Sequence, residues 1–206
     1  MTRRNPGHDC NPAALSVQMS EAPPDQDALL LLQQGDPRGF DLAYVRYAER
    51  IFGFLVRLSG SRALAQDLFQ QTFMRLAEAG ARLRADSDLR AWLFAVARNA
   101  FHSHARSRSS EARADATLFA AERMTASSPD GRLALAELER ALAGLNAGDR
   151  ELLLLFGVEG LSYPEVAVVL ELDQVTVRKR VSRARARLAE ALDDDARVMS
   201  KSRLRE

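Results

Sequence analysis

Basic side chains gather in one short stretch near the C-terminus. From Asp173 to Leu188 the chain carries six basic residues and one acid, a net charge of +5, whereas the whole chain of 206 residues has a net charge of +1. The six are Arg178, Lys179, Arg180, Arg183, Arg185 and Arg187. Guanidinium and ammonium groups bind phosphates and the acceptor atoms of guanine. The stretch is therefore a candidate for contact with DNA; the alternative is a solvated basic face on a helix, the usual role of a charge run.

Two short helices around a tight turn are predicted to position these cations. Ser162 and Glu165, with Pro164 between them, have the spacing of a capping box with proline in the first helical turn. Asp173 is expected to cap a second helix. One side of that helix is apolar at i, i+4, i+7 and i+11, through Val177, Val181, Ala184 and Leu188. The opposite side carries Val175, Lys179, Ser182 and Ala186, flanked by Thr176, Arg178 and Arg183. A helix of that width and charge fits the DNA major groove.

Residues for catalysis or for holding a cofactor are not apparent. The chain shows no nucleophile with a base, no glycine-rich phosphate loop and no metal-ligand spacing. Its one cysteine, Cys10, excludes an internal disulfide. No apolar run approaches the roughly 20 residues that span a bilayer, and no apolar segment of a secretory signal follows Arg3 and Arg4. We expect a non-enzymatic protein without a cofactor, located in the cytoplasm and not inserted into a membrane.

Composition and periodicity predict an all-α protein of two small helical domains joined by a flexible linker, the C-terminal domain containing the helix-turn-helix. Hydrophobic residues make up 47% of the chain and aromatic residues 6%, without the alternation typical of strands. Translation could start at Met1 or at Met19. The predicted segments are a disordered extension (1–24), a first domain (25–106), a linker (107–132) with one transient helix at 112–124, a second domain (133–192) and a charged, frayed tail (193–206).

Helix boundaries follow from turn and capping residues. The first domain is predicted to hold four helices, interrupted at Gly35-Asp36-Pro37, at Ser59-Gly60-Ser61 and between Gly80 and the Asp86–Asp88 loop. The second domain is predicted to begin with a helix over 133–145. Asn146 caps the next helix, which runs through Phe156 and stops at Gly157 to Gly160.

Four blocks of the sequence, in this order, resemble a bacterial sigma factor of the extracytoplasmic-function class of the sigma-70 family: FDLAYVRYAERIFGFL, AQDLFQQTFMRL, DLRAWLFAVARN and GLSYPEVAVVLELDQVTVRKRVSRARARL. The resemblance covers about residues 25–192. It implies two conserved domains, regions 2 and 4, and a function in promoter-specific transcription initiation with core RNA polymerase. Region 2 would recognise and melt the −10 element, and region 4 would read the −35 element.

The resemblance also assigns residues of the first domain. It implies that Asp67, Gln70 and Gln71 dock on a coiled coil of the polymerase β′ subunit, where spacing alone would favour a solvated helix face. It implies a −10 site formed by Asp86, Ser87 and Asp88, with Arg98, Asn99 and Arg106 behind them. Trp92 could stack on a base, but its register with Leu89, Leu93 and Val96 favours packing in the core.

In the second domain the resemblance implies that the −35 element is read by Arg178, Lys179, Ser182 and Arg183, while Thr176 and Arg185 hold phosphates. The turn departs from the family pattern, since Glu171 stands where glycine is usual. Because glutamate enters the left-handed conformation only at a cost, we expect a slightly different turn. Residues 133–172 hold seven acids and two arginines; the excess either solubilises the support helices or limits nonspecific DNA binding and meets a polymerase surface.

The implied partners are core RNA polymerase, through its β′ coiled coil and β flap, promoter DNA, and an anti-sigma factor; the chain would act as a monomer. Two other interpretations stay open at this point. A helix-turn-helix repressor or activator would bind a palindromic site tightly without polymerase. A helical interaction module would not bind DNA at all.

Overall fold

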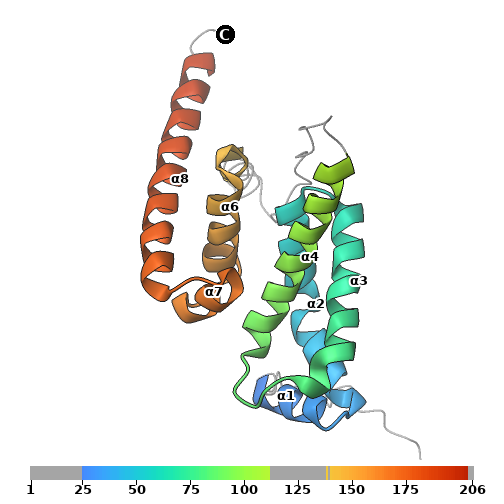
Figure 1. Ribbon diagram of the computed structural model, residues 1–206. Coiled ribbons are helices and arrows are strands. Elements are labelled where there is room, and N and C mark those ends of the chain that lie inside the picture. Colours follow the sequence, from blue (N-terminus) through green and yellow to red (C-terminus); the bar gives the residue numbers. More distant parts are fainter. Residues whose placement is uncertain (1–24, 112–137, 139, 204–206) are drawn as a thin grey trace, which may run out of the picture.

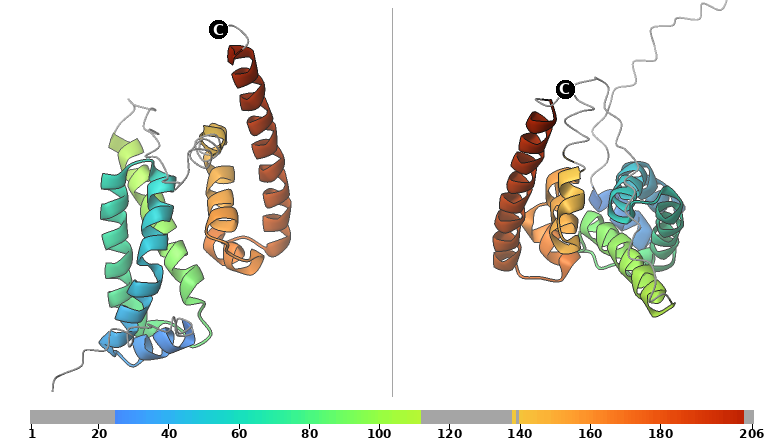
Figure 2. Two further views of the ribbon diagram at one scale, coloured as in Figure 1. Left: turned by 180° about the vertical axis from the view of Figure 1, so that it is seen from behind. Right: turned by 90° about the horizontal axis from the view of Figure 1, so that it is seen from above.

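The computed structural model describes residues 25–111, residue 138 and residues 140–203. Within these ranges every regular element is helical and none is a strand, which confirms the predicted all-α class. The helices form two groups, here called lobe one (residues 25–111) and lobe two (138 and 140–203), which lie side by side (Figures 1 and 2). The predicted extension 1–24 and the transient helix at 112–124 lie outside the described residues.

Lobe one contains the four predicted helices. They are α1 (Asp25–Gln33), α2 (Pro37–Ser59), α3 (Arg62–Ala79) and α4 (Leu89–Glu111), with a 3-10 turn, η2 (Gly80–Arg82), after α3. Helices α2, α3 and α4 form a bundle, and α1 lies across one of its ends (Figure 1). Asp36 caps α2 by accepting from the amide of Arg38 at 2.9 Å, and Ser61 caps α3. Gly60, at φ 66°, ends α2 in the left-handed conformation that glycine adopts easily.

The core of lobe one is built from large apolar side chains of α2, α3 and α4. Phe54 of α2 is fully buried and packs edge-on against Phe94 of α4, with ring centroids 5.3 Å apart. Tyr47 is buried, and its hydroxyl donates to Asp25 at 2.6 Å, which joins α2 to α1. Burial, followed by the bond to Asp25, raises the pKa of Tyr47, so the hydroxyl stays protonated. Trp92 is half-buried against this core, the packing that its register favours.

Lobe two holds the described residues 140–144, which are helical, and then α6 (Ala147–Leu153), η3 (Leu154–Val158), α7 (Tyr163–Leu170) and α8 (Gln174–Arg203). Asn146 caps α6 as expected, accepting from the amide of Asp149 at 2.9 Å. The sequence predicts one regular helix through Phe156, but η3 is a π-helical turn. The amide of Glu159 donates to the carbonyl of Leu154, five residues earlier, at 2.9 Å. This wider turn precedes the loop that meets lobe one.

Two helices are longer than the sequence predicts. Helix α4 continues to Glu111, beyond the predicted domain end at 106. Helix α8 continues to Arg203, through the tail from Asp193 that was predicted to be charged and frayed. Neither extension contains glycine or proline. Without such a residue, high charge alone does not end a helix.

The turn between α7 and α8 keeps the geometry that usually relies on glycine. Glu171 has φ 55° and ψ 44°, and it is the one non-glycine residue with positive φ in the described part of the chain. The amide of Leu172 donates to Ala167 at 2.9 Å and that of Glu171 to Val168 at 3.3 Å, the two bonds of a Schellman motif. The expected deviation of the turn was therefore wrong. Glu171 bears a strain of about 1 kcal/mol instead.

Candidate functional site

Helices α7 and α8 form the predicted helix-turn-helix, with both N-termini capped. Ser162 and Glu165 make the reciprocal bonds of a capping box: the Glu165 carboxylate accepts from the Ser162 amide at 2.6 Å, and the Ser162 hydroxyl accepts from the Glu165 amide. At the start of α8, Asp173 accepts from the hydroxyl of Thr176 at 2.6 Å and from its amide at 2.8 Å. These two bonds, the hydroxyl's first, lower the pKa of Asp173. The caps fix where α8 begins and thus which residues face outward.

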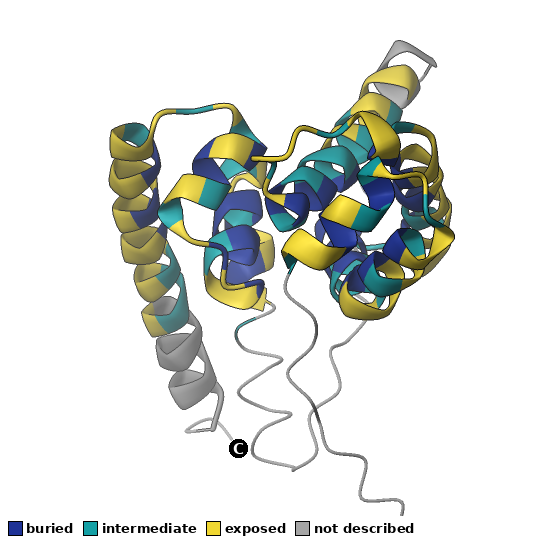
Figure 3. Cartoon of the chain, turned by 90° about the horizontal axis from the view of Figure 1, so that it is seen from below, coloured by how far each residue is buried: buried dark blue, intermediate teal, exposed yellow. Residues whose placement is uncertain are grey.

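The cationic face of α8 points to solvent. Val177, Val181 and Ala184 are buried against the rest of lobe two. The exposed side carries most of the residues predicted to contact the −35 element, namely Arg178, Lys179, Ser182, Arg183 and Arg185. Figure 3 shows this division, with the buried positions of α8 turned toward its neighbours and the exposed ones outward. The arrangement leaves a helix surface free to enter a groove.

Two aromatic rings orient cations beside this face. The guanidinium of Arg178 lies 5.2 Å from the ring centroid of Tyr163, and that of Arg185 lies 4.9 Å from that of Phe156. Such cation–π contacts limit the conformations of long side chains. Thr176 differs from the other predicted contacts because it is half-buried and its hydroxyl already donates to Asp173. A phosphate contact from this hydroxyl would have to replace that bond.

The predicted −10 loop lies over a pocket at one end of lobe one. The pocket, of about 390 Å³, is lined by Asp86, Ser87 and Asp88, by residues of α1 and α2, and by Glu165 of lobe two. Hydrogen bonds from Arg84 hold Asp86, at 3.0 Å, and lower its pKa. Asp88 caps α4 by accepting from the amide of Ala91 at 2.9 Å. The loop is thus held in shape by its own polar contacts.

The remaining residues predicted for the −10 site do not lie in this pocket. Arg98 is half-buried and forms an ion pair with Glu151 of lobe two at 2.9 Å. Asn99 is exposed and lines a separate groove of about 510 Å³ between α3 and α4, together with Gln71. Arg106 is exposed further along α4. The structure therefore separates the six predicted residues into a loop cluster and three positions along α4.

The predicted polymerase-binding residues of α3 are all exposed but face two directions. Gln71 lies on the α4 side, in the groove that it shares with Asn99, and Asp67 is one helical turn before it. Gln70 lies on the α2 side, in a groove of about 740 Å³. Aromatic rings line much of this second groove, from Phe40, Tyr44, Phe52, Phe69 and Phe73.

This aromatic groove was not identified from the sequence. The spacing of Phe40, Tyr44 and Phe73 is that of core residues, yet Tyr44 is 43% exposed. Met74, also in the groove, is 62% exposed. The rings of Tyr44 and Phe73 lie 5.0 Å apart, edge to face. The signal in the sequence is the density of aromatic residues in α2 and α3, five of which line the groove.

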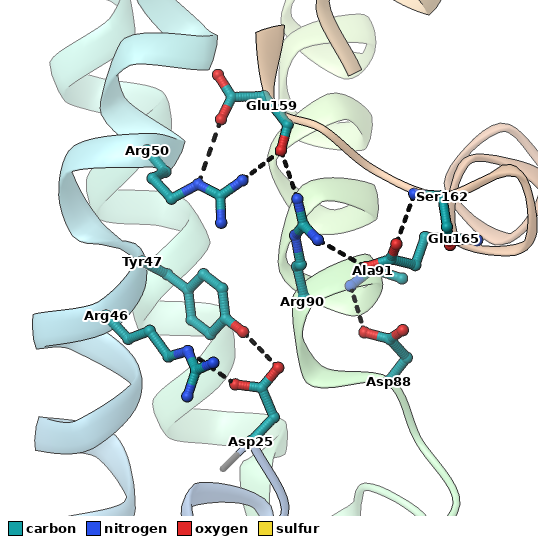
Figure 4. Close-up of polar contacts among 10 residues, drawn as sticks. All are labelled: Asp25, Arg46, Tyr47, Arg50, Asp88, Arg90, Ala91, Glu159, Ser162 and Glu165. Carbon is teal, nitrogen blue, oxygen red and sulfur yellow. Dashed lines mark hydrogen bonds and ion pairs between the residues drawn. The ribbon is translucent and has the colours of Figure 1, made fainter. Parts of the chain in front are cut away.

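A set of ion pairs between the lobes was also not predicted (Figure 4). The backbone carbonyl of Glu159 accepts hydrogen bonds from Arg50 and Arg90, and its carboxylate forms ion pairs with Arg50 and Arg57. Glu165 accepts from Arg90 at 3.2 Å. Glu151 lies 2.9 Å from both Arg98 and His102. The arginines belong to α2 and α4 of lobe one, and the three glutamates belong to lobe two.

The arrangement of a helical bundle beside a helix-turn-helix matches known proteins. Residues 43–111 match the family model described as Sigma-70 region 2, and residues 135–188 match that described as Sigma-70, region 4. The RNA polymerase sigma-H factor of Pseudomonas aeruginosa is 33% identical over 180 residues, covering 82% of this chain and 93% of the relative. The ECF RNA polymerase sigma factor EcfG of Rhodopseudomonas palustris is 33% identical, covering 68% and 77%.

A solved structure shows the same fold. The sigma factor RpoE of Bartonella quintana, determined in complex with the anti-sigma factor NepR, superposes with a TM-score of 0.65 at 32% identity, covering 75% of this chain and 96% of that one. The chain belongs to the sigma-70 family, in its extracytoplasmic-function (ECF) class. It is thus a sigma factor, whose function is promoter-directed transcription initiation. No helix in the described part of the chain is long and apolar enough to cross a membrane.

Proposed function

We propose that the two lobes act at two places on one promoter while the chain is bound to core RNA polymerase. Lobe one would dock on the polymerase and open the −10 element, and lobe two would read the −35 element through α8. The observation that carries this proposal is the free cationic face of α8, capped at its start and packed on its other side. A helix presented in this way fits the major groove of a duplex.

The residues of α8 would make two kinds of contact with DNA: some recognise bases, and others bind phosphates. Arg178, Lys179 and Arg183 can donate to guanine O6 and N7, and Ser182 can donate or accept. Arg185, further along the helix, is placed to hold a phosphate, which positions the helix without reading a base. Thr176 would contribute least, because its hydroxyl is committed to Asp173.

The polymerase-docking surface combines a polar edge with the aromatic groove. We assign the β′ coiled coil to the α2 side of α3, where Gln70 borders exposed aromatic surface. Exposed apolar surface of this kind marks interaction sites. Asp67 and Gln71 would contact the partner from the other edge of α3. Lobe two would contact the β flap.

The −10 element would be opened by the loop over the pocket of lobe one. The pocket would keep its walls from the loop, α1 and α2 when Glu165 of lobe two moves away, and these walls would receive one unstacked base. Asp86, Ser87 and Asp88 supply acceptors and a hydroxyl for the base edge, and Arg98, Asn99 and Arg106 would follow the strand along α4. Bridging the two elements needs on the order of 50 Å, about one and a half turns of DNA. About 25 extended residues between the lobes reach on the order of 80 Å.

The chain would act as a cytoplasmic, non-enzymatic monomer. Because RpoE of Bartonella quintana was solved with an anti-sigma factor, we propose that an anti-sigma factor also controls this chain. A repressor acting without polymerase is the second candidate, but the match to region 2 over residues 43–111 favours a factor that joins polymerase.

Run-off transcription tests this function. Purified chain and core polymerase are incubated with a template carrying the promoter of the chain's own operon. We expect a transcript of defined length that requires the chain and disappears when Arg178 and Arg183 are both replaced by alanine. Absence of any transcript, together with failure of the chain to retain core polymerase in a pull-down, would contradict the proposal.

A further inference from the structure

One exposed side chain of α8 is explained neither by the packing of the described residues nor by the contacts proposed above. Val175, the second residue of α8, is 61% exposed. It lies outside the apolar core of the described residues, whereas Val177 and Val181 on the other side of the helix are buried in that core. Valine is also a weak helix former, so helix propensity does not favour it here. Single exposed apolar residues are common on protein surfaces, and the position of Val175 therefore decides what it can do.

Val175 lies on the same face of α8 as two residues proposed to read bases. Lys179 and Ser182 follow it by four and seven residues, a spacing that places all three side chains along one face of an α-helix. The three are exposed, on the outer side of α8 (Figure 3). In a helix-turn-helix, the N-terminal residues of the second helix contact base edges in the major groove. Val175 would therefore meet a base pair whenever Lys179 and Ser182 do.

The start of α8 is poorly suited to hold a phosphate. The carboxylate of Asp173 accepts from the amide of Thr176 at 2.8 Å and from its hydroxyl at 2.6 Å. The cap thus occupies donors that could otherwise bind an anion, and its negative charge repels a phosphate placed beside it. An uncharged contact with a base edge is favoured at this end of the helix.

The chemistry of the side chain selects the base. Valine carries no hydrogen-bonding group, so it can recognise only an apolar group in the major groove. Thymine is the one base that presents such a group there, its 5-methyl group. The cations Arg178 and Lys179 favour guanine instead. Val175 would therefore add a base preference that the neighbouring cations cannot supply.

We infer that Val175 is a specificity-determining residue, whose side chain recognises the 5-methyl group of one thymine in the −35 element. Because an α-helix rises about 1.5 Å per residue, Lys179 lies about 6 Å further along α8 than Val175. Successive base pairs are about 3.4 Å apart, so the thymine should lie within about two base pairs of the pair that Lys179 reads. The inference rests on the proposed function, since it takes α8 to lie in the major groove at this element.

The test uses the full chain bound to core polymerase. Promoter duplexes are derived from the promoter of the chain's own operon, with about ten base pairs, one turn of DNA, randomised around −35. Bound duplexes are sequenced for the unaltered chain, for Val175→Ala and for the matched control Val168→Ala. Val168 is 58% exposed on α7, so the control makes the same change at similar exposure outside α8. Alanine is the better helix former, and circular dichroism checks that both variants fold.

We expect the unaltered chain and Val168→Ala to enrich thymine at one position of the library, and Val175→Ala to lose this enrichment. Deoxyuridine differs from thymidine only in lacking the methyl group. Placed at that position, it should weaken binding of the unaltered chain about threefold to fivefold, the effect of burying one methyl group. Val175→Ala should bind the thymidine and deoxyuridine duplexes equally.

Two results would overturn the inference. One is that deoxyuridine weakens binding of the unaltered chain and of Val175→Ala alike; the other is that it weakens neither at any thymine around −35. Arg178→Ala separates these results from failure of the proposed function. If it changes the base preference around −35 while Val175→Ala does not, α8 reads the element without Val175, and only the inference fails. If neither variant changes that preference, the assignment of α8 to the −35 element fails together with the inference.

Discussion

The two lobes present their candidate DNA-binding residues in opposite ways. On lobe two, Arg178, Lys179 and Arg183 lie on the exposed side of one helix, and their placement follows from two caps and an apolar stripe. On lobe one, the candidate residues come from a loop and from distant turns of α4, and Arg98 is engaged by Glu151. The exposed face of α8 is therefore determined by residues close together in the sequence. The accessibility of the −10 residues of lobe one depends instead on which distant segments pack against them.

The largest expected effect is on stability, and it tests whether the two lobes unfold independently. Phe54→Ala removes a fully buried ring that packs on Phe94 in lobe one. We expect a loss of about 3–5 kcal/mol in the stability of lobe one. Retention of core polymerase should be lost, while α8 keeps its helix signal and its weak affinity for duplex DNA. Thermal unfolding followed by circular dichroism measures the stability and the helix signal, and a pull-down measures retention of core polymerase. Unfolding of both lobes in a single transition would show that they fold as one unit.

The next effect concerns the exposed face of α8. Replacing Arg178 or Arg183 by alanine should each cost about 1–3 kcal/mol in promoter binding by the polymerase complex. The matched control is Arg180→Ala on the same helix, because Arg180 is exposed and is not one of the residues predicted to contact the −35 element. Competition binding with promoter duplexes measures the difference. Equal losses of promoter affinity in all three variants would mean that α8 contributes only nonspecific electrostatic attraction to DNA.

A smaller effect, on the affinity for core polymerase, should distinguish substitutions on the two edges of α3. Gln70→Ala and Tyr44→Ala alter the aromatic groove, and each should weaken binding of core polymerase by on the order of 1–2 kcal/mol. Gln71→Ala, on the α4 side, should have a smaller effect. Affinity is measured by titrating labelled chain with core polymerase. The reverse order would move the docking surface from the α2 side of α3 to its α4 side.

The smallest effect concerns the turn that aims α8. Glu171→Gly removes the strain of a left-handed glutamate, and we expect it to stabilise lobe two by up to about 1 kcal/mol. Ala186→Gly, at an exposed interior position of α8, should instead cost about 1 kcal/mol. Urea unfolding of both variants gives the comparison. Destabilisation by Glu171→Gly would show that the carboxylate makes a contribution larger than its backbone strain.

Structure that is decided by neighbouring residues could be predicted from the sequence. The caps at Ser162 and Asp173, the helix stops at Gly35 and Gly60, and the outward face of α8 all follow from residues a few positions apart. The turn at Glu171 shows the limit of such rules, because the Schellman hydrogen bonds and the packing of both helices outweigh a strain of about 1 kcal/mol.

What could not be predicted depends on contacts between distant segments. The acidic excess of lobe two was visible, but nothing local indicated that Glu159 would meet Arg50 and Arg57, over 100 positions away. The same holds for Arg98, whose charge suggested DNA while its position in the fold places it on Glu151. The aromatic residues Phe40 and Tyr44 of α2 and Phe69 and Phe73 of α3 are each four positions apart, as expected for one helix face, but their exposure depends on how the two helices cross.

Site-directed cleavage of promoter DNA would test the division of labour between the lobes most directly. The chain has a single cysteine, Cys10, so in a Cys10→Ser background an iron chelate can be attached at Ser182→Cys on α8 or at Ser87→Cys on the loop of lobe one. In complexes with core polymerase, we expect the α8 probe to cut the duplex only around −35 and the loop probe to cut only around −10. Cleavage of one and the same region by both probes, or of none by the α8 probe, would contradict the assignment of the two lobes to two promoter elements.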